Sequence, residues 1–250
     1  LACSFLPDAC QSRHAETIVV LTLITGVGAK GQVGETVAAT LARRGDTLIL
    51  VTRSASDAEQ RVADLASLGY AAHGLACDLA DPSAVRVLAE RIRRAHGGRL
   101  DNVVHLAGGF ALTGPIADAD PAETDRLLSI NYLTAFNIAR AFLPLVREAR
   151  GSFVFFASEN VFEGIRTKGS AAYTAAKAAV VALMRSLADE GREFGVRANA
   201  VAPAAIRTAT NQAAMGSEAR YVEREDVASA VAFLCSPASV AVTGQVIRLR

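Results

Sequence analysis

The sequence lacks the features that mark several large classes of protein. Its 250 residues include 26 basic and 25 acidic side chains, and the formal net charge of +1 offers no excess of positive charge for binding nucleic acid or an anionic membrane. The longest apolar runs have the length of strands and fall short of the roughly 20 residues that a membrane-spanning helix needs. There is also no internal repeat and no low-complexity tract. We therefore expect no nucleic-acid partner and no membrane partner.

Cysteine is scarce and scattered. The four cysteines have no C-x-x-C spacing and no histidine cluster nearby; they are Cys3, Cys10, Cys77 and Cys235. This pattern argues against a disulfide framework and against a zinc site, so we predict no metal. It is consistent with a reducing cytoplasm.

The composition predicts a single domain. Hydrophobic residues make up 51% of the chain and charged residues 20%, which is enough apolar material for one sizeable core. Residues 1–16 lack the basic start and apolar centre of a signal peptide, so we interpret them as a loose arm before a domain at 17–250.

Strand-like and helix-like patterns alternate along this domain. Apolar runs predict strands at 18–24, 47–51, 70–76, 102–106, 153–157, 196–201 and 245–249, and amphipathic patterns predict helices ending near Arg44 and at 56–68, 82–96, 121–150, 171–190 and 226–234. Pro144 is expected to bend or interrupt the fourth of these helices. Residues 203–223 have weak periodicity and small polar side chains, as a substrate lid would. The alternation predicts an α/β fold, a single-domain Rossmann-like doubly wound parallel sheet flanked by helices.

A glycine-rich loop separates the first predicted strand from the first predicted helix. It reads Thr25-Gly26-Val27-Gly28-Ala29-Lys30-Gly31-Gln32-Val33-Gly34. Glycines in this context let the backbone approach a pyrophosphate, which rests against the free N–H groups of the helix start. The alternative is a tight turn that only packs the helix on the strand. We favour dinucleotide binding.

Arg53 lies at the end of the second predicted strand, 19 residues after Gly34. NAD-binding folds usually carry an acid there to accept the ribose 2′-hydroxyl. A guanidinium cannot accept that hydrogen bond but can pair with a 2′-phosphate. We therefore predict a preference for NADP(H), with NAD(H) possible; the alternative is that Arg53 is a solvated loop charge.

Tyr173 and Lys177 are four residues apart in a predicted helix and so share one face. A nearby ammonium favours the phenolate and would lower the pKa of the tyrosine toward neutrality. Ser158, at the end of the fifth predicted strand, could offer a hydroxyl to the same reacting oxygen. By itself the pair could also be an ordinary surface tyrosine and lysine. By contrast, His105 lies within a strand that should be buried, so we predict a core histidine there.

These motifs follow one another in the order found in the short-chain dehydrogenase/reductase family, and the chain from about Thr17 resembles that family, mostly in its classical form. The resemblance is carried by the Thr25-Gly26 loop, Asp78 after the third strand, Ala107-Gly108, Asn131, Ser158, the Tyr173-x-x-x-Lys177 pair, Asn199, and Pro203 with Thr208. Each motif alone is weakly specific, but the ordered set is highly specific.

The resemblance implies a role for each matching residue. Tyr173 would be the general acid/base, and Lys177 would hold the nicotinamide ribose while lowering the tyrosine pKa. Ser158 would orient the substrate oxygen, and Asn131 would help to anchor a proton-relay water. The expected cofactor-binding residues are Gly26, Gly28, Gly31, Gln32, Val33, Gly34, Arg53, Asp78, Leu79, Ala107, Gly108, Tyr173, Lys177, Pro203 and Thr208.

The chain departs from the family pattern at several places. The glycine loop is longer than in the classical branch and resembles that of the extended or atypical branches. Ser158 precedes Tyr173 by 15 positions, a longer interval than is usual, and counting back the usual interval lands on Asn160. We prefer Ser158 because it keeps the strand-end position. The last residues lack the usual Asp-Gly-Gly, so a shortened C-terminus is expected.

The sequence thus predicts an NADP-preferring carbonyl reductase or alcohol dehydrogenase that moves hydride between nicotinamide and a small carbonyl or secondary alcohol. Two alternatives stay open: an epimerase or dehydratase of the extended branch, and a catalytically silent cofactor-binding scaffold. Extended enzymes usually append a substrate domain, for which little chain remains after Pro203. The resemblance also implies a homodimer or homotetramer that pairs through the long helices.

Overall fold

A computed structural model describes residues 19–250, so the expected arm at 1–16 and the domain start at 17 lie outside the described residues. The described part is built on one parallel sheet with the strand order β3-β2-β1-β4-β5-β6-β7. Its strands are β1 (Leu21–Thr25), β2 (Thr47–Thr52), β3 (Ala72–Ala76), β4 (Asn102–His105), β5 (Ser152–Phe156), β6 (Arg197–Pro203) and β7 (Val246–Leu249). This arrangement confirms the predicted doubly wound fold.

The order of strands reverses between β1 and β4, which pair with each other in the middle of the sheet. Thr25 at the end of β1 lies opposite Val51 of β2 on one side and His105 of β4 on the other. In open α/β sheets, ligands bind beyond the carboxyl ends of the strands at such a reversal. The loops that follow β1 and β4 therefore begin at the expected binding edge.

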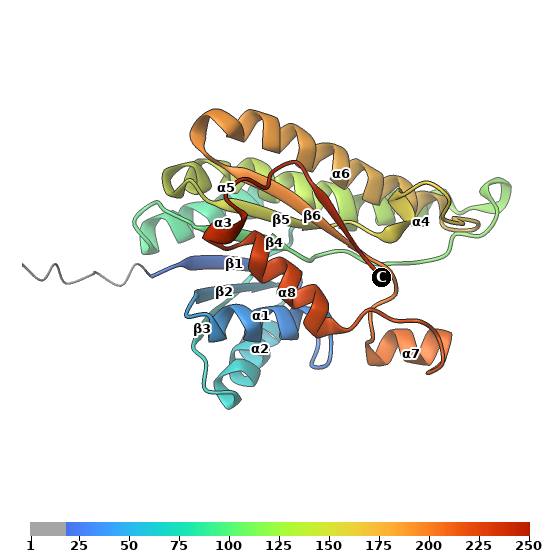
Figure 1. Ribbon diagram of the computed structural model, residues 1–250, viewed down its shortest axis with the longest axis horizontal. Coiled ribbons are helices and arrows are strands. Elements are labelled where there is room, and N and C mark those ends of the chain that lie inside the picture. The colour runs from blue at the N-terminus through green and yellow to red at the C-terminus, as the bar shows by residue number, and fades with distance from the viewer. Residues whose placement is uncertain (1–18) are drawn as a thin grey trace, which may run out of the picture.

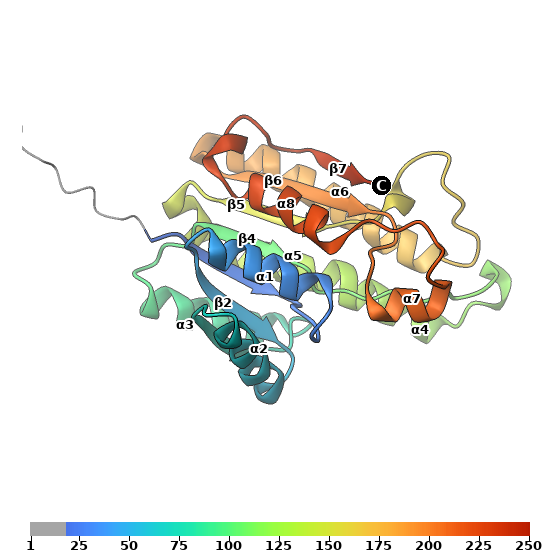
Figure 2. The ribbon, with the colours of Figure 1, turned by 60° about the horizontal axis from the view of Figure 1, so that its bottom comes forward.

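Helices cover both faces of the sheet (Figures 1 and 2). One layer contains α1 (Val33–Arg43), α2 (Ala55–Ser67) and α8 (Arg224–Leu234), and the other contains α3 (Pro82–Ala95), α5 (Thr134–Ala149) and α6 (Ala171–Gly191). Each layer has its own core: Leu41 and Val231 are fully buried in the first, and Phe142 and Met184 in the second. Because apolar side chains enclose both faces, the central strands read as continuous apolar runs.

The predicted long helix at 121–150 is interrupted, but at a different place from the one expected. It consists of α4 (Pro121–Leu128), a π-helical turn (Ser129–Leu133) and α5. Pro144 lies inside α5, so the prediction of a break there is wrong. The interruption instead surrounds Asn131, whose side-chain amide donates to the Leu127 carbonyl at 2.9 Å. Single π-turns of this kind often mark functional positions.

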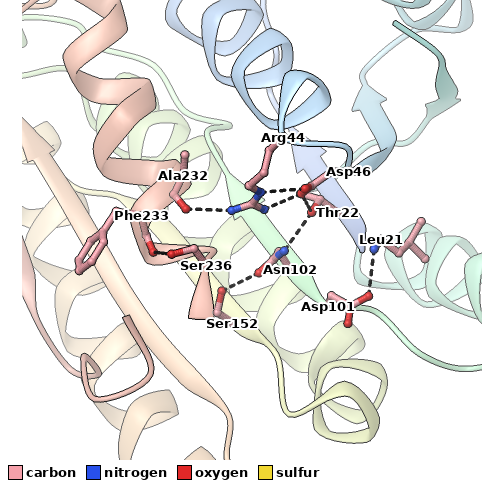
Figure 3. A network of polar contacts seen from close by, with 10 residues as sticks. All are labelled: Leu21, Thr22, Arg44, Asp46, Asp101, Asn102, Ser152, Ala232, Phe233 and Ser236. Carbon is pink, nitrogen blue, oxygen red and sulfur yellow. Dashed lines mark hydrogen bonds and ion pairs between the residues drawn. The ribbon is translucent and has the colours of Figure 1, made fainter. Parts of the chain in front are cut away.

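The amino-terminal edge of the sheet is joined by buried polar contacts (Figure 3). Asp46 accepts hydrogen bonds from Thr22 of β1 and from Arg44, each at 2.6 Å. Arg44 also donates to the Ala232 carbonyl of α8 at 2.9 Å, which ties that helix to the start of β2. This network lies at the opposite end of the strands from the candidate site, so we assign it to stability.

The predicted lid at 203–223 contains one short helix, α7 (Ala209–Met215). An isolated bridge pairs Ile206 with Val222 and closes the segment into a loop. In Figure 2, α7 lies beyond the carboxyl ends of the central strands, which is the edge of the sheet where a ligand is expected to bind. Across residues 19–250, no helix has both the length and the apolar character required to cross a membrane.

Candidate active site

Tyr173 and Lys177 lie one turn apart near the start of α6, as predicted. The Lys177 ammonium is 5.8 Å from the centroid of the Tyr173 ring. The Ser158 hydroxyl lies close enough to Tyr173 to act on the phenol, and its effect is to lower the pKa of Tyr173. Ser158 comes directly after the end of β5, so the sheet and α6 together place these three side chains at one point.

Lys177 is almost completely buried, with 5% of its surface exposed. Its ammonium donates a hydrogen bond to the main-chain carbonyl of Phe156 at 2.8 Å. Burial lowers the pKa of Lys177 to about 8, because the charged form loses its hydration. The lysine is therefore held in a fixed position at the base of the site.

The pKa of Tyr173 is shifted upward, whereas the sequence predicted a downward shift. Burial raises the pKa above its ordinary value, and the nearby Ser158 hydroxyl offsets this only in part. Lys177 does not produce the lowering of the Tyr173 pKa that was expected. The physical reason is that desolvation of the phenolate outweighs the other effects in this pocket. Tyr173 thus stays a neutral phenol near pH 7, which is the form that can donate a proton.

The structure separates Ser158 from its sequence alternative, Asn160. Ser158 caps the 3₁₀ turn Glu159–Val161 and accepts a hydrogen bond from the Asn160 N–H at 3.3 Å. The Asn160 side-chain amide instead donates to the hydroxyls of Ser170 and Thr174, at 3.5 and 3.4 Å. The longer interval before Tyr173 is taken up by the loop that follows this turn. Ser158 therefore faces Tyr173, and Asn160 holds that loop.

Asn131 joins the π-turn to the loop that follows β4. Its side-chain amide donates to the Gly109 carbonyl at 2.9 Å, and its oxygen accepts from the Gly109 N–H at 3.2 Å. A methyl group on Gly108 would lie 2.5 Å from the Asn131 oxygen and 3.2 Å from the Lys177 nitrogen. Glycine at 108 thus lets three elements meet, and it brings Asn131 close to Lys177.

The glycine loop has the geometry of a cradle. Gly26, Gly28 and Gly31 all have positive φ, between 71° and 81°. A methyl group on Gly26 would lie 2.4 Å from the Ala107 nitrogen, so β1 and β4 end in direct backbone contact. A methyl group on Gly34 would lie 2.2 Å from the Val27 carbonyl oxygen, so the start of α1 packs directly on the loop. No side chain among the described residues caps this helix start at Gln32.

These features fit a dinucleotide. The backbone can approach closely at the glycines, and the uncapped N–H groups of α1 attract an anion. Val33 is the first residue of α1 and Gln32 directly precedes it, so both lie where a pyrophosphate would rest. The Gln32 side chain also donates to Thr210 of α7 at 3.2 Å, which joins the loop to the lid.

The other expected cofactor residues lie at the same edge of the sheet. Arg53 is exposed beyond the end of β2, and Asp78 is exposed beyond β3. Asp78 accepts a hydrogen bond from the Ala80 N–H at 3.0 Å, and the neighbouring Leu79 carbonyl accepts one from Asn137 at 3.0 Å. This stretch is therefore fixed between β3 and α3 and can form one wall of an adenosine site.

Pro203 and Thr208 are located where the lid leaves the sheet. Pro203 is the last residue of β6, and Thr208 is the N-cap of α7, where its hydroxyl accepts from the Asn211 N–H at 3.2 Å. The Asn199 side chain is buried and bonds the loop before β7 through Val242 and Gln245. Asn199, one of the residues that match the family pattern, thus has a structural role.

His105 is a core histidine, as predicted. Its two ring nitrogens contact the hydroxyls of Thr25 at 2.8 Å and Thr134 at 3.3 Å. Burial, with a smaller effect from Lys177, lowers the pKa of His105 to about 3, so it stays neutral. Between residues 19 and 250, no cluster of three or more metal-binding side chains occurs.

Three residues at the site escaped the sequence reasoning. The ring of Phe110 meets that of Tyr173 edge-on, with centroids 4.9 Å apart, although Phe110 is 60% exposed. Arg61 of α2 donates to the Gly28 carbonyl at 2.9 Å, and Glu35 of α1 accepts from the Gly31 N–H at 2.6 Å. An arginine and a glutamate on amphipathic helices carry no sequence signal for such contacts. Phe110 follows the Ala107-Gly108-Gly109 run, which is the one available hint.

Comparisons with known proteins agree with this geometry. A family model described as enoyl-(acyl carrier protein) reductase matches residues 26–249. A tropinone reductase homologue from Arabidopsis thaliana is 30% identical and covers 97% of this chain and 80% of its own. A hydroxy-methyl-oxo-hexahydro-indene-carboxyl-CoA reductase from Mycobacterium tuberculosis is 32% identical, with coverage of 92% and 90%. The solved structure of a short-chain type dehydrogenase/reductase from Mycobacterium ulcerans has a TM-score of 0.83 and 32% identity, covering 92% of this chain and 87% of that one.

The match extends over nearly all of the described domain rather than over the dinucleotide cradle alone. It includes the sheet, the lid and the helix that carries Tyr173 and Lys177. The predicted family and enzyme class are therefore confirmed: this chain belongs to the short-chain dehydrogenase/reductase family and is an NAD(P)-dependent oxidoreductase.

Proposed function

We propose that the protein is an NADP-preferring carbonyl reductase, which can also run as an alcohol dehydrogenase, acting on a small carbonyl or secondary alcohol. The observation that carries this proposal is the meeting of Tyr173, Ser158 and Lys177 at the carboxyl edge of the sheet. A neutral phenol and a second hydroxyl at one point can together bind a single substrate oxygen.

The chemistry follows from the protonation states of these groups. In reduction, a nicotinamide cofactor, when bound, would supply the hydride that adds to the carbonyl carbon. Tyr173 donates its phenolic proton to the oxygen, and the Ser158 hydroxyl holds that oxygen in place. The raised pKa of Tyr173 keeps this proton available at neutral pH.

Lys177 and Asn131 would support the proton transfer. A positively charged Lys177 stabilises the phenolate that Tyr173 becomes as it loses its proton. Its pKa of about 8 leaves it mostly charged at pH 7 and able to exchange a proton near that pH. Asn131 holds the Gly109 backbone beside Lys177, and we assign it the relay position.

The cofactor would lie along the glycine loop and across the reversal of strand order. Gly26, Gly28 and Gly31, with the start of α1, would hold the pyrophosphate. The exposed guanidinium of Arg53 at the end of β2 supports a preference for the 2′-phosphate of NADP. Asp78 would meet the adenine.

We also propose that the protein works in the cytoplasm as a homodimer or homotetramer that pairs through α5 and α6. Leu133 at the end of the π-helical turn and Phe136 in the first turn of α5 are 45% and 40% exposed, and neighbouring exposed apolar side chains can form part of a protein–protein contact. Size-exclusion chromatography with light scattering tests this assembly. A single monomeric species at working concentration would contradict it.

The substitution Tyr173→Phe tests the proposed chemistry, with Tyr70→Phe on the far side of the domain as a matched control. The purified variants are assayed for NADPH oxidation with a panel of ketones and aldehydes, and NADPH binding is measured by cofactor fluorescence. Tyr173→Phe is expected to lower kcat by about a hundredfold or more while leaving NADPH affinity nearly unchanged. A wild-type protein that binds NADPH but reduces no carbonyl would overturn the proposal.

A further inference from the structure

A second feature of the carboxyl edge is a cavity of about 320 Å³ between the lid and the ends of β5 and β7. Its wall on the sheet side includes Glu159, which directly follows Ser158, and Ala204, which directly follows Pro203. Two residues of its lining are thus direct sequence neighbours of Ser158 and Pro203, at the same edge of the sheet as the candidate site. A substrate whose carbonyl lies at Ser158 and Tyr173 could extend into it.

The charged lining of this cavity is mostly positive. Arg220 and Arg250 line it together with a single acid, Glu159. Glu159 already accepts from Arg248 at 2.6 Å and from Arg250 at 2.7 Å. Glu159 therefore pairs with the two arginines of the chain end, and no ion pair joins it to Arg220 among the described residues.

Arg220 has no ion-pair partner and no side-chain hydrogen bond among residues 19–250. The nearest acids along the chain are occupied elsewhere: Glu223 pairs with Arg207 at 2.7 Å, and Glu218 contacts Ser217. Arg220 thus presents an uncommitted guanidinium to the cavity. Arginine is well suited to bind a carboxylate or phosphate through two parallel hydrogen bonds.

The wall that carries Arg220 is fixed in place by its neighbour Tyr221. The Tyr221 hydroxyl donates to the Gly216 carbonyl at 2.6 Å, and the Arg207 guanidinium lies 5.0 Å from the centroid of its ring. The next residue, Val222, donates its N–H to the Ala205 carbonyl at 2.8 Å. Alanines and Met215 complete an otherwise apolar lining. The cavity therefore combines apolar wall residues with the positive group of Arg220.

We propose that this cavity is a subsite for an anionic end of the substrate, and that Arg220 confers a preference for oxo compounds that carry a carboxylate on an aliphatic chain. The inference rests on the proposed function, because it takes Ser158 and Tyr173 as the place of the carbonyl. Arg250 is the second guanidinium of the subsite, partly committed to Glu159.

The test compares aliphatic oxo acids of increasing chain length with their methyl esters, in NADPH-dependent reduction by the wild type and Arg220→Gln. The acids are ionised at pH 7 and the esters are uncharged, while the carbonyl and the chain are the same. At the chain length that spans the cavity, we expect the acid to have a kcat/KM about tenfold or more above that of its ester. In Arg220→Gln most of this preference should be lost through a higher KM for the acid, with little change in kcat or in the kinetics of the ester.

Two controls separate a local effect from a general one. Arg86→Gln removes an exposed arginine from α3, on another side of the domain, and should leave the preference intact. Arg220→Lys keeps the charge but loses the planar fork, and should keep part of the preference. The subsite is overturned if the wild type reduces acid and ester equally well, or if Arg220→Gln slows the reduction of both equally. Either result leaves the proposed function standing.

If no carbonyl compound in the series is reduced, the proposed function fails and the subsite is tested by binding alone. Calorimetry then measures binding of the same oxo acids to the enzyme with NADP⁺ bound. If Arg220→Gln weakens acid binding about tenfold and Arg86→Gln does not, the anion subsite is supported. The absence of measurable acid binding, or equal binding by all variants, overturns it.

Discussion

The Lys177 ammonium donates to the main-chain carbonyl of Phe156, with 2.8 Å between nitrogen and oxygen. This contact joins α6, which carries Tyr173, to the last residue of β5, which precedes Ser158 by two positions. The same lysine that would stabilise the tyrosinate therefore also fixes the two elements that bring Tyr173 and Ser158 together. Because Lys177 is almost fully buried, the loss of hydration of its ammonium lowers the stability of the fold.

The first prediction concerns that cost. The pKa of Lys177 in the folded protein is about 8, below the ordinary 10.5, because the charged form is desolvated. This difference corresponds to about 3 kcal/mol of destabilisation at neutral pH. Lys177→Met would recover it but leave the Phe156 carbonyl without its donor, at about 1–2 kcal/mol. We expect Lys177→Met to be about 1–2 kcal/mol more stable than the wild type at pH 7, and inactive.

The higher stability of Lys177→Met should depend on pH between about pH 8 and 10.5. Between pH 8 and 10.5 the unfolded chain binds the lysine proton more strongly than the folded protein does, so wild-type stability gains from rising pH there. The advantage of Lys177→Met is thus complete below about pH 8 and shrinks toward pH 10.5. Urea unfolding of both proteins across this range measures it, with the exposed Lys168→Met as control. A constant difference, or a less stable variant at pH 7, contradicts the assignment.

The second prediction uses the close approach at Gly108. A methyl group there would lie 2.5 Å from the Asn131 oxygen and 3.2 Å from the Lys177 nitrogen. Gly108→Ala should therefore displace Asn131, lowering kcat by about tenfold to a hundredfold and stability by about 1–3 kcal/mol. Gly109→Ala is the matched control, because its methyl group would meet only the flexible end of Ile130. Steady-state kinetics and thermal unfolding distinguish the two, and equal effects would contradict the prediction.

Most of the fold could be read from the sequence because its signals are local. The alternation of buried strands and amphipathic helices predicted the sheet, and the spacing of Tyr173 and Lys177 predicted their shared face. The π-turn at Asn131 could not be read in this way. Pro144 is the stronger local signal for a break, yet α5 accommodates it, while the turn at 129–133 depends on contacts with the loop after β4.

The direction of the Tyr173 pKa was mispredicted for a related reason. A sequence shows which charge is near but not how much water is excluded, and at Tyr173 burial has the larger effect. The contacts of Glu35 and Arg61 with the glycine loop depend in the same way on how α1 and α2 pack. Such contacts between segments are visible only in three dimensions.

The third prediction follows from Glu35. Its carboxylate accepts the Gly31 N–H at 2.6 Å, within the first turn of α1 where cofactor phosphates would rest. A negative charge there repels the phosphates and occupies a donor that they could use. Glu35→Gln should therefore bind NADPH and NADH more tightly, by about threefold to tenfold at low ionic strength, while losing less than about 1 kcal/mol of stability.

Fluorescence titration at low and high salt measures this effect. The gain in affinity should shrink as salt rises, because added ions screen the carboxylate from the phosphates. Glu35→Asp keeps the charge on a shorter side chain and serves as the control, with affinity close to that of the wild type. Weaker cofactor binding by Glu35→Gln would mean that the carboxylate shapes the loop for the cofactor, contrary to the prediction.

The fourth prediction concerns the choice between the two cofactors. Arg53 is exposed beyond β2, and the Gly26 N–H bonds the Val51 carbonyl at 3.1 Å, so the glycine loop and the end of β2 are held side by side. Arg53→Asp removes the partner of a 2′-phosphate and adds an acceptor for a ribose 2′-hydroxyl. We expect NADPH affinity to fall about tenfold or more and NADH affinity to hold or rise, as measured by parallel titrations. Arg166→Asp, on an exposed loop, controls for the change in net charge. Arg53 does not select the cofactor if Arg53→Asp leaves the ratio of NADPH to NADH affinity unchanged. The same conclusion holds if Arg166→Asp shifts that ratio as much as Arg53→Asp does.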